Sequence, residues 1–258
     1  MSAAPFRPRT AMVLAAGLGT RMRPLTDDRP KALVEVGGRA LIDHMLDRLA
    51  DAGVERAVVN VHAFADRLIA HLGRRRGGPA LTVVDEREHP LPLETGGGIK
   101  NARLHLGDAP ILVANIDSVW LEDVEPPARA IADLCTGFDP ERMTARLLLA
   151  RMERTSGFDG SGDFFMESDG RLQSRKVLGR PTAPLNYMGV HIVDPGLIYA
   201  HPEVAFALPE HWWAWAAAGR LHGALMEGDW MHVGDPVARD EAERRLAAHA
   251  PTPLRAAG

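Results

Sequence analysis

The sequence predicts an α/β fold with a mostly parallel sheet and helices on both of its faces. Short apolar runs that suit buried strands alternate with segments of helical periodicity through the first half of the chain. Strands that alternate with helices imply βαβ units, and such units produce a parallel sheet. The length of 258 residues suits one large α/β domain or two small ones.

The first half of the chain contains the clearest elements. Residues 12–16 form a short apolar run that ends at glycine, as expected for a buried strand. Residues 41–52 carry apolar side chains at helical spacing and are closed by Gly53. Further strands are expected at residues 56–61, 81–84 and 111–115, and further helices at residues 63–72 and 99–106, the last beginning just after a triple glycine. Polar residues follow several of these strands, and ligands of such sheets gather beyond the carboxyl ends of the strands.

The pattern changes after about residue 150. Residues 157–162 are rich in loop-forming side chains. Strands are expected at residues 163–166, 172–177 and 187–193, and helices at residues 210–218 and 241–249. The sequence contains neither an internal repeat nor a long linker. We therefore expect a single domain over residues 1–258, whose second half walls one side of a cleft.

The composition indicates which kinds of partner and which cellular compartment to expect. Apolar residues make up 46% and charged residues 25%, as in ordinary globular proteins, and the formal net charge of −4 disfavours a nucleic-acid partner. Cys135 is the only cysteine, which excludes an internal disulfide and fits a reducing cytoplasm. No apolar run reaches the roughly 18–20 residues of a membrane span. The run at residues 11–16 is too short for a signal peptide. We expect a cytoplasmic protein without a membrane partner.

The strongest motif is LAAGLGTRMRPLT at residues 14–26, followed by PKAL at residues 30–33. Glycines let the backbone approach phosphate oxygens, and backbone N–H groups in such a loop form an anion-binding nest. Arg21 can bridge two phosphate oxygens, and Lys31 adds a point charge. Gly-x-Gly alone is equally typical of a tight strand–helix turn with solvated arginines. The loop has neither the Gly-Lys-Ser/Thr of a Walker motif nor the third glycine of a dinucleotide fingerprint.

The full string resembles the signature of the sugar-1-phosphate nucleotidyltransferases, and the resemblance extends from Met12 to about Leu246. It implies a Rossmann-like fold of the nucleotide-diphospho-sugar transferase type. The nucleotide-binding half would span about 10–150 and the sugar-binding half about 151–240. In that family the glycine loop wraps the phosphates of an NTP, and the resemblance implies catalytic roles for Arg21 and Lys31. The phosphate-binding residues implied are Ala16, Gly17, Gly19, Thr20, Arg21 and Lys31.

A second motif, PLETGGGI at residues 92–99, places three glycines before an expected helix. Taken alone, this arrangement suits either the close approach of a ligand or a flexible helix-entry loop. In the family the equivalent loop holds the nucleobase through backbone groups, and the matching residues here are Glu94, Thr95, Gly96 and Gly97. The motif LETGGG at residues 93–98 resembles that of the N-acetylmuramate-1-phosphate uridylyltransferase branch of the family, which acts in peptidoglycan recycling.

A third motif places Asp117 shortly after the strand expected at residues 111–115. Such an aspartate is well placed to hold a metal against phosphate, although an aspartate after a strand is more often a turn former or a helix cap. The family has a Mg²⁺-binding aspartate at this position, so the resemblance implies a catalytic role for Asp117. The family often has glycine before this aspartate, where this chain has Ile116.

A fourth motif, GDWMHVGDP at residues 228–236, resembles the family's Trp-x-Asp-Val-Gly-Thr. The aspartate of that motif is the second metal ligand. Here His232 occupies its position, and Asp235, which we expect to point elsewhere, occupies that of the threonine. Mg²⁺ prefers oxygen ligands, whereas Mn²⁺ tolerates imidazole. We expect Asp117 and His232 to bind Mg²⁺, with Mn²⁺ as an alternative ion. A structural, hydrogen-bonded His232 is the competing interpretation.

The sugar pocket is expected from the second half, where residues 162–164 and 186–189 resemble sugar-lining stretches of related enzymes. The family's Glu-Lys-Pro motif is absent, and Arg175 and Lys176 lie near the position of its lysine. Either side chain could bind the sugar phosphate, and a solvated basic strand end explains the pair equally well. The expected sugar-binding residues are Asp163, Asn186, Tyr187, Gly189, Arg175 and Lys176.

These motifs predict an enzyme that joins a sugar 1-phosphate to an NTP and releases pyrophosphate. A sugar phosphate is already a nucleophile at neutral pH, so positioning and charge neutralisation carry the catalysis. The expected substrates are UTP and N-acetylmuramate 1-phosphate, which give UDP-N-acetylmuramate. The alternatives are a guanylyltransferase for mannose or heptose 1-phosphate, and a non-catalytic nucleotide-sugar sensor that the departures at Ile116 and His232 would suit. All expected partners are small molecules, and the oligomeric state does not follow from the sequence.

Overall fold

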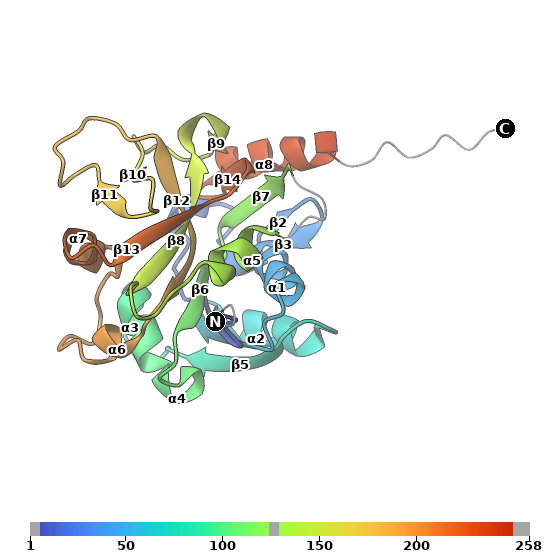
Figure 1. Cartoon of the computed structure of the whole chain (residues 1–258). Coiled ribbons are helices and arrows are strands. Elements are labelled where there is room, and N and C mark those ends of the chain that lie inside the picture. Colours follow the sequence, from blue (N-terminus) through green and yellow to red (C-terminus); the bar gives the residue numbers. More distant parts are fainter. Residues whose placement is uncertain (1–5, 124–128, 250–258) are drawn as a thin grey trace.

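The computed structural model describes residues 6–123 and 129–249 of the chain. A nine-stranded sheet runs through the middle of the molecule, and helices surround it (Figure 1). None of the helices in these two segments has the length and apolar character that crossing a membrane requires.

The strands fall into three sheets. The large sheet contains β1 (Thr10–Leu14), β4 (Arg56–Val61), β5 (Ala80–Asp85), β6 (Ile111–Asn115), β8 (Ala145–Arg151), β10 (Phe164–Met166), β11 (Leu172–Ser174), β12 (Leu185–Val193) and β13 (Leu221–Leu225). The small sheets contain β7 (Ser118–Glu122), β9 (Thr155–Ser156) and β14 (Gly228–His232), and β2 (Glu35–Val36) with β3 (Arg39–Ala40).

Eight α-helices connect and cover these strands in the described part of the chain. They are α1 (Leu41–Asp51), α2 (Ala65–Arg74), α3 (Glu94–Asn101), α4 (Arg103–Leu106), α5 (Arg129–Thr136), α6 (Gly196–Tyr199), α7 (Pro209–Ala217) and α8 (Pro236–His249). Short 3₁₀ helices occupy Thr20–Met22, Lys31–Leu33 and Met152–Arg154.

The large sheet is mixed but mostly parallel. Strands β5, β4, β1 and β6 lie side by side and are parallel. Strand β12 is antiparallel to β6, β8 and β10, while β13 is parallel to β8. Since β11 is antiparallel to β10, only β12 and β11 oppose the common direction of the other seven strands. The predicted fold class is confirmed.

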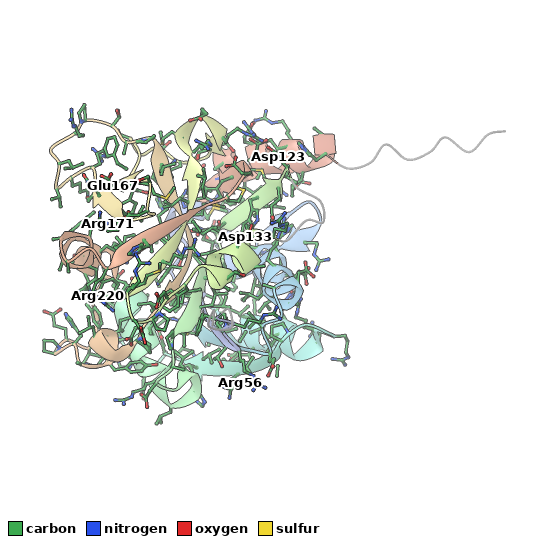
Figure 2. The ribbon with its side chains drawn as sticks, in the orientation of Figure 1. Arg56, Asp123, Asp133, Glu167, Arg171 and Arg220 are labelled. Carbon is green, nitrogen blue, oxygen red and sulfur yellow. The ribbon has the colours of Figure 1, made fainter. Side chains whose placement is uncertain are left out.

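Alternate residues of β1 enter two different hydrophobic cores, one on each face of the sheet. Ala11 and Val13 belong to a core that also contains buried side chains of α1, α2 and α5. Met12 belongs to the other core, with buried side chains of α3, α4, α6 and α7. This alternation with a period of two is the physical signature of a strand covered on both faces. Charged side chains such as Arg56 and Asp133 lie along the outside of the ribbon (Figure 2).

The expectation that a helix begins after the triple glycine is wrong. Helix α3 begins at Glu94 and contains all three glycines. A Cβ added at Gly96 would lie 2.2 Å from the ring of Phe206, and one at Gly97 would lie 2.3 Å from the carbonyl oxygen of Val204. The glycines therefore permit close packing of the chain around residue 205 on the helix, and they are not a flexible entry loop.

Other boundaries differ by a few residues, and nine strands and α-helices of the described residues were not predicted. Strand β1 ends at Leu14, so Ala15 and Ala16 already belong to the glycine loop. The strands and α-helices that were not predicted are β2, β3, β7, β8, β9, β13, β14, α5 and α6. Strand β8 is buried along almost its whole length, and such short apolar runs lack the alternation that separates a strand from a helix.

Candidate active site

Two adjoining cavities lie at one edge of the large sheet. The larger has a volume of ≈ 620 Å³ and is lined from the carboxyl ends of β1, β4 and β6, the residue after β5, the glycine loop and the start of α3. We call it the donor cavity. Parallel α/β sheets bind ligands at this edge because the loops that follow their strands open there.

The glycine loop forms the end of the donor cavity that the sequence predicts to bind phosphate. All six predicted phosphate-binding residues line it: Ala16, Gly17, Gly19, Thr20, Arg21 and Lys31. Gly19 has a left-handed φ of 65°, which favours glycine, and its carbonyl accepts a hydrogen bond of 2.8 Å from Oγ1 of Thr26. A Cβ at Gly19 would lie 3.1 Å from the Cβ of Lys31. Gly19 therefore allows the loop to pack closely against the lysine.

Arg21 lines this end of the cavity. The residue is exposed, and its side chain forms no hydrogen bond or ion pair within residues 6–123 and 129–249. A guanidinium without a protein partner retains its full capacity to bind two phosphate oxygens.

Asp117 lies between two nitrogen groups from distant parts of the chain. Its Oδ2 is 2.8 Å from Nζ of Lys31 and 3.5 Å from Nε2 of His232. Burial by itself would raise the pKa of Asp117, but the positive charge of Lys31 holds that pKa well below its usual range. Asp117 is therefore an anion at neutral pH.

The imidazole of His232 has a fixed orientation. Its Nδ1 lies 3.0 Å from the carbonyl oxygen of Gly157. A carbonyl oxygen only accepts, so Nδ1 carries a proton, and in the neutral ring Nε2 presents its lone pair on the side of Asp117. The sequence left metal binding and a structural hydrogen bond as alternatives for His232, and the orientation of the ring is compatible with both.

A divalent cation fits this arrangement when phosphate oxygens and water complete its coordination shell. The described residues contain no cluster of three or more His, Cys, Asp or Glu side chains that could hold a metal. Mg²⁺ usually keeps several waters and binds one or two carboxylates together with substrate phosphates. Asp117 supplies one carboxylate and His232 one imidazole, so the donor set suits an ion that arrives with a nucleotide.

The donor cavity is also lined by a buried polar pair that the sequence analysis missed. Oδ1 of Asn60 accepts a hydrogen bond of 2.8 Å from the N–H of Ala15, and its Nδ2 donates to Oε1 of Glu86 at 3.0 Å. Glu86 is fully buried, its Oε2 has no hydrogen-bond partner among the described atoms, and burial raises its pKa. The only local signal was their position at the ends of two expected strands.

The start of α3 lies beside this pair. Glu94 and Thr95 line the donor cavity as predicted, and Glu94 has a left-handed φ of 62°. Oγ1 of Thr95 accepts a hydrogen bond of 2.7 Å from the N–H of Leu208. Gly96 and Gly97 do not reach the cavity, because they are buried against residues 204–206. Their N–H groups are both directed to the carbonyl oxygen of Phe206.

The smaller cavity has a volume of ≈ 280 Å³ and shares Asn115 and Asp117 with the donor cavity. We call it the acceptor cavity. Six aromatic side chains line it: Phe158, Phe164, Tyr187, Trp212, Trp213 and Trp230. Aromatic faces suit the C–H faces of a sugar ring, and the few polar groups among them can fix its orientation.

Four of the six predicted sugar-binding residues line the acceptor cavity: Asp163, Lys176, Tyr187 and Gly189. The carboxylate of Asp163 accepts a hydrogen bond of 3.0 Å from the N–H of Tyr187, and burial raises its pKa. The hydroxyl of Tyr187 shares a hydrogen bond of 2.6 Å with Nδ1 of His191. Nζ of Lys176 lies 5.6 Å from the ring centre of Trp213, within the range of a cation–π contact.

The other two predicted sugar-binding residues lie outside the cavity. Asn186 is fully buried, and its Nδ2 donates to Oγ1 of Thr155 at 3.1 Å. The guanidinium of Arg175 donates to the carbonyl oxygen of Gly162 at 2.7 Å. In each case the structure places the next residue, Tyr187 or Lys176, at the cavity. Asn186 and Tyr187 are neighbours in β12, and neighbouring residues of a strand point to opposite sides. Arg175 and Lys176 lie in the turn that follows β11. The sequence did not indicate which residue of either pair faces the cavity.

The two departures from the family motif have structural explanations. Ile116 is 5% exposed and packs in the core that contains α1 and α5. The carboxylate of Asp235 accepts a hydrogen bond of 2.9 Å from the N–H of Ala238 and so caps α8. Asp235 therefore caps a helix, and Ile116 packs in the core while also lining the donor cavity between Asn115 and Asp117.

Comparisons with known proteins show which family the chain resembles. Residues 11–145 match the family described as the MobA-like NTP transferase domain. The chain is 52% identical to an N-acetylmuramate alpha-1-phosphate uridylyltransferase of Caulobacter vibrioides, over 93% of this chain and 98% of that protein. It is 32% identical to the protein of that name from Neisseria meningitidis serogroup B, over 92% of this chain and 98% of that one.

Solved structures show the same fold at low sequence identity. A UDP-glucose pyrophosphorylase in complex with UDP-glucose superposes with a TM-score of 0.73 at 14% identity, covering 93% of this chain and 99% of that one. HddC from Yersinia pseudotuberculosis has a TM-score of 0.65 at 19% identity, covering 92% and 99%. Because one curated relative is more than half identical over nearly the whole chain, this chain is a nucleotidyltransferase and belongs to the sugar-1-phosphate nucleotidyltransferase family.

Proposed function

We propose that this enzyme transfers UMP from UTP to N-acetylmuramate 1-phosphate, giving UDP-N-acetylmuramate and pyrophosphate. The proposal includes Mg²⁺ as the cofactor and a place in peptidoglycan recycling in the cytoplasm. The single observation that carries it is that the donor and acceptor cavities share Asn115 and Asp117. Two substrates that fill these cavities would meet at those side chains. The identities of the two substrates come from the names of the two uridylyltransferase relatives.

The reaction needs positioning and charge neutralisation more than proton transfer. An oxygen of the sugar phosphate attacks the α-phosphorus of UTP in line, and the bond from that phosphorus to the pyrophosphate oxygen breaks. Arg21 and Lys31 would bind the phosphates of the donor and neutralise the charge that develops on the leaving pyrophosphate. A phosphate monoester is already a nucleophile at neutral pH, so no side chain has to remove a proton.

The metal would be held by Asp117 and Nε2 of His232. Mg²⁺ in this position would supply positive charge to oxygens of the donor phosphates. Lys31 keeps Asp117 ionised before the nucleotide arrives, because its ammonium group lies 2.8 Å from the carboxylate. The carboxylate is then ready to bind a cation without first losing a proton.

The base would lie at the Asn60–Glu86 end of the donor cavity. The structure shows no hydrogen bond from the N–H groups of Glu94 or Thr95 to any described residue, so both can donate to a base carbonyl. The free Oε2 of Glu86 can accept from an imino N–H. A uracil presents both kinds of group on one edge.

Glu86 also favours a second candidate, guanylyl transfer. A carboxylate can accept two neighbouring N–H donors, and guanine presents an imino and an amino group side by side. The donor base is therefore the part of the proposal that most needs a direct measurement.

The test is a pyrophosphate-release screen of four NTPs against a panel of sugar 1-phosphates, with and without Mg²⁺. We expect metal-dependent release that is greatest with UTP and N-acetylmuramate 1-phosphate. Higher turnover with GTP at matched sugar phosphate would replace uridylyl by guanylyl transfer. Nucleotide-sugar binding without pyrophosphate release from any pair would mean a sensor and would contradict the catalytic assignment.

A further inference from the structure

Asn115 occupies the junction of the two cavities. It is the last residue of β6, and the register of β6 with β1 pairs it with Leu14, directly before the glycine loop. It lines the donor cavity and the acceptor cavity, and the only other residue that does so is Asp117 among those described. Of these two side chains, Asn115 is the one whose amide group carries N–H donors whatever the pH.

The side-chain amide of Asn115 is not used by the fold. Neither its oxygen nor its nitrogen forms a hydrogen bond with a described residue, although the residue is half-buried. Asn60 differs, because both ends of its amide bind Ala15 and Glu86. Asn186 differs as well, since its nitrogen donates to Thr155. A half-buried amide without a protein partner is costly unless water or a ligand satisfies it.

On the side of the acceptor cavity, Gly189 lies directly against the side chain of Asn115. Gly189 on β12 has a left-handed φ of 82°, and it lies within the irregular stretch between Tyr187 and His191. A Cβ at Gly189 would lie 3.1 Å from the Cβ of Asn115 and 3.2 Å from its Nδ2. A side chain at position 189 would therefore press on the amide. The glycine leaves Asn115 its place between the two cavities.

The two substrates must touch at the α-phosphorus of the donor nucleotide, and this requirement determines where that phosphorus lies. The attacking oxygen must come within about 3–3.5 Å of the phosphorus that it attacks. The α-phosphorus of a donor in one cavity can meet an acceptor in the other only at their junction, where Asn115 and Asp117 lie.

We propose that the amide of Asn115 is a further catalytic group, which donates a hydrogen bond to a non-bridging oxygen of the donor α-phosphate. The proposal rests on the transfer reaction described above. The sugar-phosphate oxygen forms its bond to the α-phosphorus as the bond to pyrophosphate breaks, and the leaving oxygen keeps the electron pair. The amide transfers no proton. Its N–H stabilises the charge on the equatorial oxygens, in the same way as the donor of an oxyanion hole.

The first test is the kinetics of Asn115→Ala and Asn115→Asp. We expect kcat to fall by roughly 10²–10³, as for the loss of one oriented donor, while KM for both substrates and the thermal unfolding temperature change little. The Asp variant should lose at least as much, because its charge repels the phosphate. Asn101→Ala is the matched control, since Asn101 is exposed at the end of α3. Variants at position 115 that keep wild-type kcat would overturn the proposal.

The second test uses the two diastereomers of UTP with sulfur at a non-bridging α-position. In the wild type, sulfur at the oxygen that Asn115 binds should slow transfer, and in Asn115→Ala this penalty should disappear for that diastereomer alone. Equal penalties in both proteins would overturn the contact. A loss of discrimination between UTP and 2′-deoxy-UTP, with unchanged sulfur penalties, would assign Asn115 to the ribose and overturn it too.

The substrate preference of the wild-type enzyme distinguishes a failure of the Asn115 proposal from a failure of the proposed function. If it uses GTP and ignores UTP, the uridylyl assignment fails alone, and the same comparison is made with the α-thio analogues of GTP. If the preferred pair is UTP and N-acetylmuramate 1-phosphate but the variants are fully active, the role of Asn115 fails alone.

Discussion

Nζ of Lys31 lies 2.8 Å from Oδ2 of Asp117, although 86 positions of the chain separate the two residues. The same carboxylate oxygen is 3.5 Å from Nε2 of His232, at the end of β14. One anion is thus placed between a fixed positive charge and a ring nitrogen, beside a glycine loop. This arrangement can bind a nucleotide polyphosphate with its cation, and it makes the roles of individual side chains testable.

Arg21→Ala should lower kcat by roughly 10²–10³, as expected for loss of one oriented transition-state donor. Its unfolding temperature should equal that of the wild type, because the Arg21 side chain has no partner among the described residues. Steady-state kinetics and thermal unfolding measure the two effects. Arg23→Ala is the control, since Arg23 is exposed and its one ion pair with a described residue is the exposed contact with Asp27. A fully active Arg21→Ala enzyme would remove Arg21 from the mechanism.

His232→Asp should shift the metal preference toward Mg²⁺. A carboxylate at this position adds a hard oxygen ligand, whereas the imidazole of the wild type is better tolerated by Mn²⁺. We expect the ratio of activity with Mn²⁺ to activity with Mg²⁺ to be higher in the wild type than in the variant. Asp117→Asn should cost far more activity than any change at position 232. An unchanged metal ratio would mean that His232 only supports the loop through Gly157.

Gly97→Ala should destabilise the fold and disturb the donor cavity. Its Cβ would lie 2.3 Å from the carbonyl oxygen of Val204, and this backbone atom can move only with its segment. Overpacking of this kind costs about 1–3 kcal/mol in the free energy of unfolding. Urea unfolding should show this loss, whereas Gly17→Ala should unfold like the wild type, because nothing lies within 4 Å of a Cβ at Gly17. Equal stability of the two variants would refute the packing role of Gly97.

Glu86→Gln should change how stability depends on pH. Burial raises the pKa of Glu86, so the folded protein holds this proton to a higher pH than the unfolded chain does. The wild type should therefore lose stability as pH rises from the unfolded-state pKa of about 4.3 to the raised folded pKa. The neutral glutamine removes this loss, so the stability advantage of the variant should grow through that window and then stay constant.

Urea unfolding across the acid-to-neutral range measures the effect. Glu88→Gln is the control, because the side chain of Glu88 is 75% exposed. If the difference between Glu86→Gln and the wild type does not change with pH, the carboxyl of Glu86 does not titrate differently in the folded protein.

The sequence by itself determined the fold class, the glycine loop and the position of Asp117. These features are local: a strand, the loop that follows it and its charged side chains are contiguous in the chain. Alternation of apolar runs with helical periodicity is likewise visible in short windows. Ala16, Gly17, Gly19, Thr20 and Arg21 of the glycine loop therefore line one cavity, and Lys31 of the following short helix lines it as well.

Only the tertiary structure decided which neighbouring residue faces the acceptor cavity, as for Tyr187 and Asn186. It also revealed the Asn60–Glu86 pair and placed Asn115 at the junction of the cavities. The packing of Phe206 against Gly96 shows why the sequence could not predict such features. Whether a glycine lies in a flexible loop or under a ring depends on residues more than a hundred positions away, and local periodicity carries no information about such contacts.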